Sequence, residues 1–233
     1  MITFKKVNKW FGELHVLNDV DFHVDSGEVV VICGPSGSGK STLIRCINKL
    51  EPIQQGEIYV DNMPIHDPKI NLRRVREEIG FVFQQFNLYP HMTVLKNITL
   101  APIHVRKQKK EEAEAYAHML LEKVDIAEKA NSYPDQLSGG QQQRVAIARA
   151  IVNQAPIILA DEPTGNLDTH TSREIMELFQ RLNGESGITV ILVTHEADIA
   201  AYSRRTIRFL DGRLVSDRLT ADERRGSETG VGS

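Results

Sequence analysis

The stretch that decides the fold is Val29-Val-Val-Ile-Cys33, followed directly by Gly34-Pro-Ser-Gly-Ser-Gly-Lys-Ser41. The first part is a continuous β-branched run without alternation, which is typical of a strand covered on both faces in a parallel sheet. The second part fits the phosphate-binding loop pattern, and a helical pattern from Thr42 to Leu50 follows it. A strand, a glycine-rich loop and a helix in this order predict a phosphate site at the edge of an α/β sheet.

The residue types of this loop suit the binding of phosphate. Glycines 34, 37 and 39 let backbone N–H groups close around phosphate oxygens, and the following helix N-terminus adds positive potential. Lys40 can reach the β and γ phosphates, and Ser41 can ligate Mg²⁺. The alternative interpretation is a glycine-rich turn that only caps a helix. The residues expected to bind nucleotide here are Gly34, Pro35, Ser36, Gly37, Ser38, Gly39, Lys40, Ser41 and Thr42.

Two acidic residues end a second apolar run, Ile157-Ile-Leu-Ala-Asp161-Glu162. Open α/β sheets bind ligands at the carboxyl ends of their strands, so Asp161 is a candidate Mg²⁺ partner. Glu162 lies one residue beyond, where it can orient or deprotonate an attacking water in phosphoryl transfer. Taken alone, such acids are more often solvated loop residues. Their combination with a phosphate loop favours the catalytic interpretation.

The remaining apolar patterns predict two kinds of sheet. Residues 2–4 and 20–24 alternate in strand fashion, which indicates an antiparallel β layer at the start of the fold. The runs at 79–83 and 189–193 are typical of buried strands, and helical segments separate them, as in an α/β sheet. Asp211-Gly212 favours the positive φ angles of a tight hairpin.

An inserted helical region is expected in the middle of the chain. Between Lys107 and Val124, apolar residues recur on one helical face and charged residues fall elsewhere. The predicted organisation is a first part of the core with the antiparallel layer (1–85), a helical subdomain (86–154), a second part of the core (155–219) and a disordered tail (220–233).

Composition excludes several classes of protein. The 233 residues are 41% hydrophobic and 25% charged, which suits a globular domain rather than a disordered chain. A net charge of -3 argues against a broad nucleic-acid footprint, so no nucleic-acid partner is expected. Apolar runs stay far below the roughly 20 residues that cross a bilayer, and residues 1–7 do not resemble a signal peptide. Cytosol is the expected compartment.

Leu137-Ser-Gly-Gly-Gln141 introduces a helical pattern that runs to Ile151. Ser138 is a natural helix-capping residue, so a capped helix is the preferred interpretation of this segment when it is taken alone.

The order of the motifs along the chain decides whether Leu137–Gln141 is only a capped helix or a functional motif. The phosphate loop, Leu137–Gln141, Asp161-Glu162 and a strand-terminal His195 occur in the order of ATP-binding cassette (ABC) ATPases, and the resemblance covers residues 1 to about 219. It implies a P-loop NTPase core with an antiparallel β subdomain and an inserted α-helical subdomain. It also implies ATP hydrolysis with ATP and Mg²⁺ bound.

The same resemblance implies a homodimer with ATP sandwiched between head-to-tail subunits. In this family the segment corresponding to Leu137–Gln141 closes over the γ-phosphate held by the other subunit's phosphate loop. The residues expected to act across the interface are Ser138, Gly139, Gly140 and Gln141.

Three further site residues follow from the family pattern. Gln84, rather than Gln85, matches the residue that senses Mg²⁺ or the attacking water. His195 matches the histidine that contacts the γ-phosphate, and Asp168 matches the loop that crosses the dimer interface. Without the family pattern, a lone histidine would be taken as a structural residue.

Phe11 lies where this family stacks an aromatic ring on adenine, with Trp10 beside it. Tyrosine is commoner at this position, so Phe11 departs from the family pattern, but stacking needs only the face of the ring. The alternative is a core aromatic at the edge of the β layer.

The resemblance to subfamilies divides at about Ala155. The earlier residues, including Leu100-Ala-Pro-Ile103, are similar to ATPases of bacterial polar amino-acid importers. The later residues, including 159–168 and 189–214, are similar to macrolide and lipoprotein exporter cassettes. A natural mosaic and an engineered chimera both fit this pattern, and import and export both stay open.

The family pattern also predicts the partners. The chain is expected to bind separate transmembrane subunits at the cytoplasmic face of the inner membrane, without contacting the cargo. Residues 86–92 are the expected dock for a short helix of those subunits, and packing inside the helical lobe is the alternative. Other functions left open are a soluble ABC ATPase of translation or DNA repair and a small-molecule kinase. Leu137–Gln141 argues against the kinase.

Overall fold

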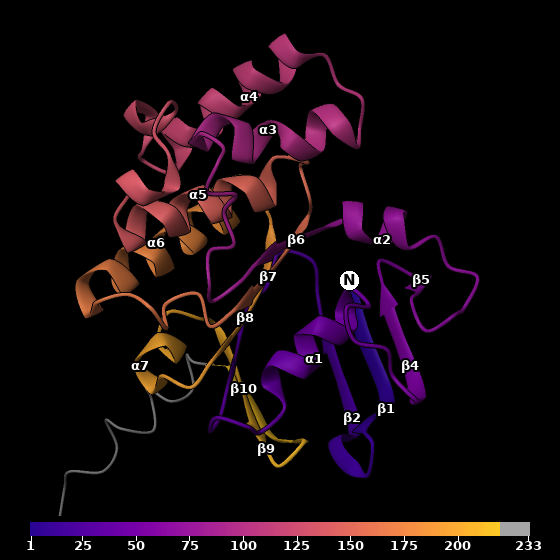
Figure 1. Ribbon diagram of the computed structural model, residues 1–233. Helices are drawn as coiled ribbons and strands as arrows, with labels where there is room; N and C mark the ends of the chain where they lie inside the picture. Colours follow the sequence, from indigo (N-terminus) through magenta and orange to yellow (C-terminus); the bar gives the residue numbers. More distant parts are fainter. Residues whose placement is uncertain (220–233) are drawn as a thin grey trace, which may run out of the picture.

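The computed structural model describes residues 1–219, and the tail predicted for residues 220–233 lies outside the described residues. The described residues form two sheets with helices around them (Figure 1). One sheet has four strands in the order β2-β1-β4-β5, and the other has six in the order β10-β9-β3-β8-β7-β6. The predicted α/β class is confirmed.

The four-stranded sheet is antiparallel throughout. It consists of β1 (Ile2–Phe11), β2 (Leu14–Val24), β4 (Gln55–Val60) and β5 (Met63–Pro64). Along β2 the burial alternates from residue 20 to residue 24, so one face of the strand packs on the core. The predicted antiparallel layer is therefore present at the start of the chain.

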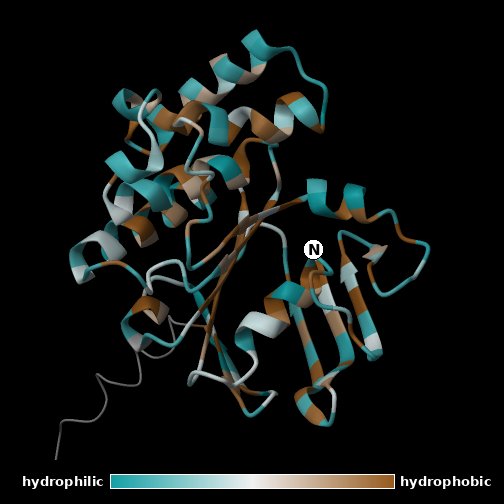
Figure 2. Ribbon diagram, viewed as in Figure 1, coloured by the Kyte–Doolittle hydropathy of each residue, from teal (hydrophilic) through white to brown (hydrophobic). Residues whose placement is uncertain are grey.

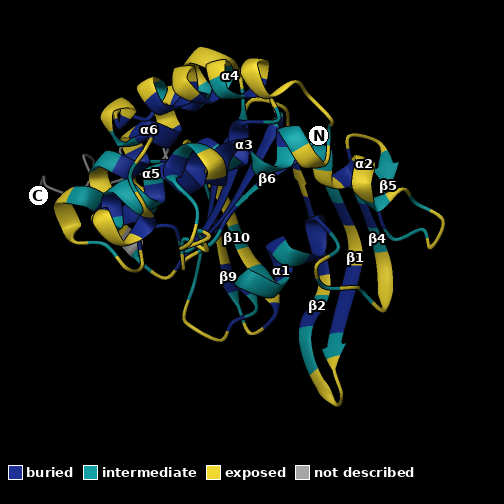
Figure 3. Ribbon diagram, turned by 45° about the horizontal axis from the view of Figure 1, so that its top comes forward, coloured by how far each residue is buried: buried dark blue, intermediate teal, exposed yellow. Residues whose placement is uncertain are grey.

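The six-stranded sheet carries the buried apolar runs. Its parallel strands are β3 (Val29–Cys33), β6 (Ile79–Val82), β7 (Ile157–Asp161), β8 (Thr189–Thr194) and β9 (Arg205–Leu210). The sheet is hydrophobic along its middle strands (Figure 2), and helices and the antiparallel layer bury both of its faces (Figure 3). Continuous β-branched runs form these strands because neither face meets water.

Strand β10 (Arg213–Leu219) closes the edge of this sheet by pairing antiparallel to β9. The turn between them places Asp211 at φ 46° and Gly212 at φ 76°, as expected from the Asp-Gly dipeptide.

Helix α1 (Lys40–Ile47) follows the phosphate loop and differs from its predicted bounds. The sequence pattern extended from Thr42 to Leu50, whereas the helix begins two residues earlier and ends three residues earlier. It ends because Asn48 leaves the helical region and Lys49 takes a left-handed φ of 53°. The prediction of the C-terminal end was therefore wrong.

A helical lobe lies between β6 and β7 and contains α3 (Val94–His104), α4 (Lys110–Lys123) and α5 (Gly139–Ile151), with short 3₁₀ turns η1 (Ala127–Lys129) and η2 (Pro134–Gln136). The apolar face predicted between residues 107 and 124 is buried in α4. The subdomain boundaries near residues 85 and 155 stay a prediction.

The remaining helices are α2 (Leu72–Glu77), α6 (Thr169–Ser186) and α7 (Ala197–Ala200). Among residues 1–219, none of the helices combines the length and the apolar character that crossing a membrane requires.

Candidate nucleotide-binding site

The strand order brings four predicted segments to one edge of the six-stranded sheet. Strands β3, β8, β7 and β6 are parallel neighbours, and in their register Cys33 pairs with Thr194 and Asp161 with Val193. The phosphate loop, Asp161-Glu162, His195 and Gln84 come at or just beyond the carboxyl ends of these strands. This is the edge at which open α/β sheets bind ligands.

The phosphate loop is compact, with its lysine folded inward. Lys40 is 4% exposed, and its Nζ donates hydrogen bonds to the carbonyls of Gly34 at 2.8 Å and Pro35 at 2.9 Å. Burial lowers the pKa of Lys40, and the nearby carboxylates of Glu162 and Asp161 act in the opposite direction. A phosphate group would replace the neutral carbonyls with a charged partner, which a buried ammonium favours.

Two glycines let this loop pack closely on neighbouring backbone, and a buried serine in the loop lacks a partner. A Cβ at Gly34 would collide with the Phe209 carbonyl, and Gly39 has a φ of 103° with the Val16 carbonyl close by. Ser38 Oγ is buried, and the described residues give it no hydrogen-bond partner. An unpaired buried hydroxyl in a phosphate loop is explained if a phosphate oxygen satisfies it. Ser36 and Gly37 are exposed at the tip, and Thr42 is half-buried in α1.

Asp161 is buried at the end of β7, and both of its carboxylate oxygens are hydrogen-bonded. Ser41 Oγ donates to Oδ1 at 2.7 Å, and Arg45 Nη2 donates to Oδ2 at 2.8 Å. Sequence reasoning missed Arg45, although its place four residues after Ser41 puts both side chains on one helical face.

The donor set at Asp161 fits a magnesium ion. A serine hydroxyl and a carboxylate within hydrogen-bond distance of one another supply the oxygen ligands that Mg²⁺ prefers. The side-chain amide of Gln84, the predicted third ligand, lies beside Gly165. A Cβ built at Gly165 would be 3.0 Å from Gln84 Nε2.

Glu162 and His195 form a pair at the sheet edge. His195 Nδ1 lies 2.8 Å from Glu162 Oε2, and the glutamate side chain is 16% exposed. Glu162 has a positive φ of 46°, and its backbone N–H donates to the Val193 carbonyl. A left-handed φ at a non-glycine residue costs conformational energy, which is typical of functional sites. If Glu162 is ionised, Nδ1 carries the imidazole proton.

Gln84 is joined to the loop after β7. Asn166 Nδ2 donates to the Gln84 carbonyl at 2.9 Å. Sequence reasoning missed Asn166, because residues 82 positions apart leave no local pattern that connects them. The contact links the Gln84 loop to the segment that leads to Asp168.

Ser138 starts α5 with a full capping box. Its Oγ accepts from the Gln141 N–H, and Gln141 Oε1 accepts from the Ser138 N–H. Ser138 is exposed, so the N-terminus of a 13-residue helix faces solvent with its positive potential. The predicted cap is confirmed, and this end is suited to an anion.

The helix starts of α5 and α6 touch. Asp168 caps α6 by accepting from Thr171 N and Thr171 Oγ1, and these hydrogen bonds lower the pKa of Asp168. A Cβ at Gly140 would collide with Thr171 Cγ2, so only glycine fits there without a shift. Gly139 lies near Leu167 and is half-buried.

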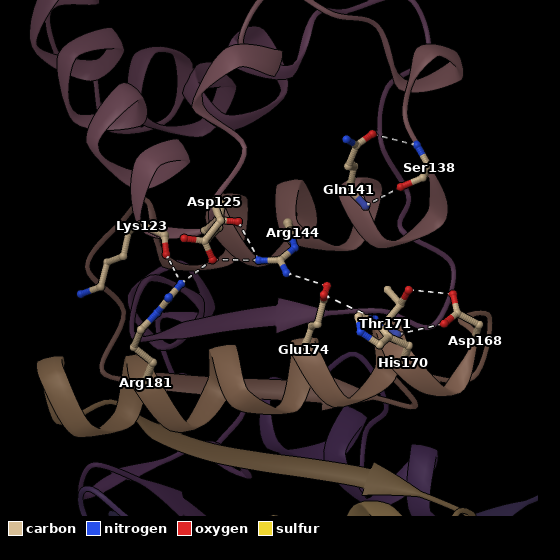
Figure 4. Close-up of polar contacts among 11 residues, drawn as sticks. Lys123, Asp125, Ser138, Gln141, Arg144, Asp168, His170, Thr171, Glu174 and Arg181 are labelled. Atoms are coloured by element: carbon tan, nitrogen blue, oxygen red, sulfur yellow. Dashed lines mark hydrogen bonds and ion pairs between the residues drawn. The ribbon is translucent and has the colours of Figure 1, made fainter.

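A network of charged side chains holds α5 to α6 further along (Figure 4). Arg144 of α5 donates to Asp125 Oδ2 and to Glu174 Oε2, both at 3.0 Å. Arg181 of α6 donates to the same Asp125 oxygen at 2.8 Å, and this hydrogen bond is the main cause of a lowered Asp125 pKa. The segment containing Ser138 and the helix capped by Asp168 are therefore tied together along their length.

Phe11 is 45% exposed at the end of β1, which rules out its alternative interpretation as a core residue. Its strand partner in the β1–β2 hairpin is Leu14. Two residues further along β2, the Val16 carbonyl approaches Gly39 of the phosphate loop, so the hairpin rises beside that loop. Trp10 instead stacks on His15 at 4.2 Å.

A groove of about 420 Å³ lies beside the Gln84 loop. Residues from the predicted docking stretch, from η2 and from α5 line it. Arg149 of α5 donates to the carbonyls of Phe86 and Asn87, so this stretch is fixed to the helical lobe. The groove residues include Phe86, Leu88, Pro90, Pro134, Gln142 and Asn166.

Comparison with known protein families and sequences gives a consistent result. Residues 17–165 match the family model described as ABC transporter. The chain is 52% identical over 218 residues to the glutamine transport ATP-binding protein GlnQ of Geobacillus stearothermophilus, covering 93% of this chain and 90% of that protein. It is 48% identical to the glutamate/aspartate import ATP-binding protein GltL of Escherichia coli (strain K12), with the same coverage.

Solved structures are similar as well. A post-hydrolysis dimer of the ATP-binding cassette MJ0796, bound to ADP and Pi, has 43% identity and a TM-score of 0.85, covering 94% of this chain and 99% of that chain. The structure of cbiO1 from Clostridium perfringens, part of the ABC transporter complex cbiONQ, has 29% identity and a TM-score of 0.89. It covers 98% of this chain and 92% of that chain.

Proposed function

Because the chain belongs to the ABC transporter family of ATPases, we propose that it is the ATP-hydrolysing subunit of a transporter whose membrane-spanning part is formed by separate subunits. The observation that carries the proposal is the meeting of the phosphate loop, Asp161-Glu162 and His195 at one sheet edge. That edge combines phosphate binding with groups able to handle an attacking water.

In this proposal the loop from Gly34 to Thr42 binds the ATP phosphates, with Lys40 turning from its carbonyl partners to the β and γ phosphates. Ser41, Asp161 and Gln84 hold Mg²⁺, which neutralises phosphate charge when it is bound. Glu162 accepts a proton from the attacking water or orients it.

Two further residues complete the chemistry of the site. His195 holds Glu162 in place through its 2.8 Å hydrogen bond and contacts the γ-phosphate. Phe11 stacks on adenine; its ring is exposed on the hairpin whose Val16 carbonyl approaches the phosphate loop.

The working unit in this proposal is a head-to-tail homodimer with two ATP molecules at its interface. Support comes from the exposed, capped N-terminus of α5 at Ser138. Such a helix end suits a phosphate that is held by the phosphate loop of the other subunit. The similar cassette MJ0796 is dimeric in its ADP- and Pi-bound state. Ser138, Gly139, Gly140 and Gln141 then contact the partner's nucleotide, and Asp168 lies at the interface.

Membrane subunits dock in this proposal at the groove beside Gln84, which accepts a short helix. The chain then works as a peripheral protein at the cytoplasmic face of the inner membrane and never contacts the cargo. The similar proteins named for glutamine and for glutamate/aspartate transport support import of a polar amino acid. The mosaic of an importer-like part before about Ala155 and an exporter-like part after it stays a prediction.

Capture of the membrane partner tests this function. The tagged chain in detergent extracts should recover a membrane protein with several spans, and vesicles containing both should take up a polar amino acid when ATP is supplied. Tyr89, exposed beside the groove, gives the informative variant, Tyr89→Glu, which should abolish capture. Met119→Glu on α4 is the matched control, because Met119 is 63% exposed and lies elsewhere. Equal capture by both variants, or capture of soluble proteins alone, would contradict the proposal.

A further inference from the structure

A lysine that is almost completely buried packs on the ring of Phe11. Lys9 has a side chain 4% exposed, although it lies on β1 only two residues before the exposed Phe11. Its Nζ sits over the Phe11 ring, 4.3 Å from the ring centroid. Glu51 Oε2 lies 3.5 Å from the same nitrogen and supplies a counter-charge. A buried lysine is uncommon, and here it is paired both with a carboxylate and with a ring face.

The strand end that carries the ring is also fixed. Gln54 Oε1 accepts from the Trp10 N–H at 3.0 Å, and Gln54 Nε2 donates to the Trp10 carbonyl at 3.2 Å. The backbone N–H and carbonyl of Trp10 are therefore both hydrogen-bonded to one side-chain amide. These bonds extend the contact between the strands beyond the pairing of Asn8 with Gln55. A ring held in this way loses little conformational freedom when a ligand stacks on it.

We propose that Lys9 is a positioning residue for recognition of the adenine base, acting through the ring of Phe11. The proposal rests on the stacking role of Phe11 given above. The ammonium occupies one face of the ring, so a base stacks on the other face. The cation draws ring electron density toward itself, and this makes the free face a better partner for the electron-rich purine. Glu51 keeps the ammonium over the ring.

The consequence is specific to the base. Loss of the Lys9 charge should weaken only ligands that carry a purine and should leave phosphate binding at Lys40 intact. The informative quantity is therefore the ratio of two affinities, one for ATP and one for inorganic triphosphate, measured on the full chain with Mg²⁺ present.

The chain offers a matched control on the same strand. Lys5 Nζ lies 4.9 Å from the Tyr59 ring centroid and 3.8 Å from Glu57, so it repeats the lysine–aromatic–glutamate arrangement. Its side chain is 58% exposed. Lys5→Met should leave both affinities unchanged.

The test compares Lys9→Met, Phe11→Leu and the double variant by calorimetric titration. Phe11→Leu should lower the ratio about 5- to 100-fold, the range for loss of a base–aromatic stack. Lys9→Met should lower it at least about 3-fold, because both the polarisation of the ring and its fixed position are lost, with triphosphate affinity preserved. In the Phe11→Leu background, Lys9→Met should change nothing further. If Lys9→Met fails to fold, Lys9→Gln takes its place, because its amide can still bond to Glu51.

The outcomes separate the two proposals. If Phe11→Leu leaves the ratio unchanged, the stacking role fails and the role of Lys9 fails with it. If Phe11→Leu lowers the ratio but the Lys9 variant leaves it unchanged, or weakens ATP and triphosphate equally, only the inference about Lys9 is overturned.

Discussion

The Arg45 guanidinium donates a hydrogen bond to Asp161 at 2.8 Å, so a cationic side chain already contacts the carboxylate that is proposed to hold Mg²⁺. Asp161 is 3% exposed, and an uncompensated charge at that depth is costly. Arg45 therefore stabilises the nucleotide-free chain, and its role overlaps with the one proposed for the metal ion.

Arg45→Met should destabilise the nucleotide-free chain by about 1–3 kcal/mol, the range for a lost hydrogen bond to a buried charged group, reduced because Arg45 is 43% exposed. Mg-ATP should then raise the Tm of the variant more than that of the wild type, whereas ATP with a chelator should not. Lys110→Met, which breaks the exposed pair with Glu114, should cost less than about 0.5 kcal/mol. Urea unfolding measures the two losses of stability, and thermal melts measure the Tm shifts. If Mg-ATP raised the Tm of Arg45→Met and of the wild type equally, the overlap would be excluded.

Glu162→Gln should bind Mg-ATP normally and hydrolyse it at least ~10²-fold more slowly, the scale of general-base loss. The amide keeps the size of the side chain and can still hydrogen-bond to His195, but it cannot accept the proton of water. An ATP-bound dimer should accumulate, which size-exclusion chromatography with multi-angle light scattering detects. Retention of wild-type turnover would rule out this role for Glu162.

Gly140→Ala should push the start of α5 away from α6, because the added Cβ collides with the Thr171 methyl. We expect a loss of about 1–3 kcal/mol, typical of overpacking, and weaker ATP-dependent dimerisation. Gly184→Ala is the control: Gly184 lies in α6 with open space around its Cβ position. That change should stabilise the chain by about 0.4–1 kcal/mol. If Gly140→Ala left both the stability and the ATP-dependent dimerisation unchanged, the close contact would not matter.

Local patterns were sufficient to predict the buried strands β3, β6, β7 and β8, whereas β4 and β5 were not predicted. Continuous β-branched runs such as Val29–Cys33 form strands buried on both faces, and the parallel register then fixes which loops meet. Ser41 and Asp161 were each predicted to hold Mg²⁺, and the structure places Ser41 Oγ 2.7 Å from Asp161 Oδ1. Ser138 was predicted correctly as a cap because capping depends on neighbouring residues.

Contacts that depend on tertiary packing were not predictable. Arg144 meets Glu174 only because α5 and α6 lie side by side, and Asn166 meets Gln84 across two separate loops. The early end of α1 depends on a left-handed backbone at Lys49, and a lysine in the sequence does not predict that conformation. The sequence pattern did not single out Lys9, and its burial under Phe11 is visible only in the structure.

The most direct test of the account asks whether one ATP site needs two chains. Lys40→Ala and Ser138→Arg each spoil both sites of their own homodimer. A mixed dimer places an intact Lys40 opposite an intact Ser138 and restores one site. In a Glu162→Gln background, so that bound ATP is not consumed, the account predicts that mixing the two variants traps labelled ATP that neither variant traps alone. If mixed dimers form but trapped ATP does not rise above the unmixed variants, the shared site is contradicted.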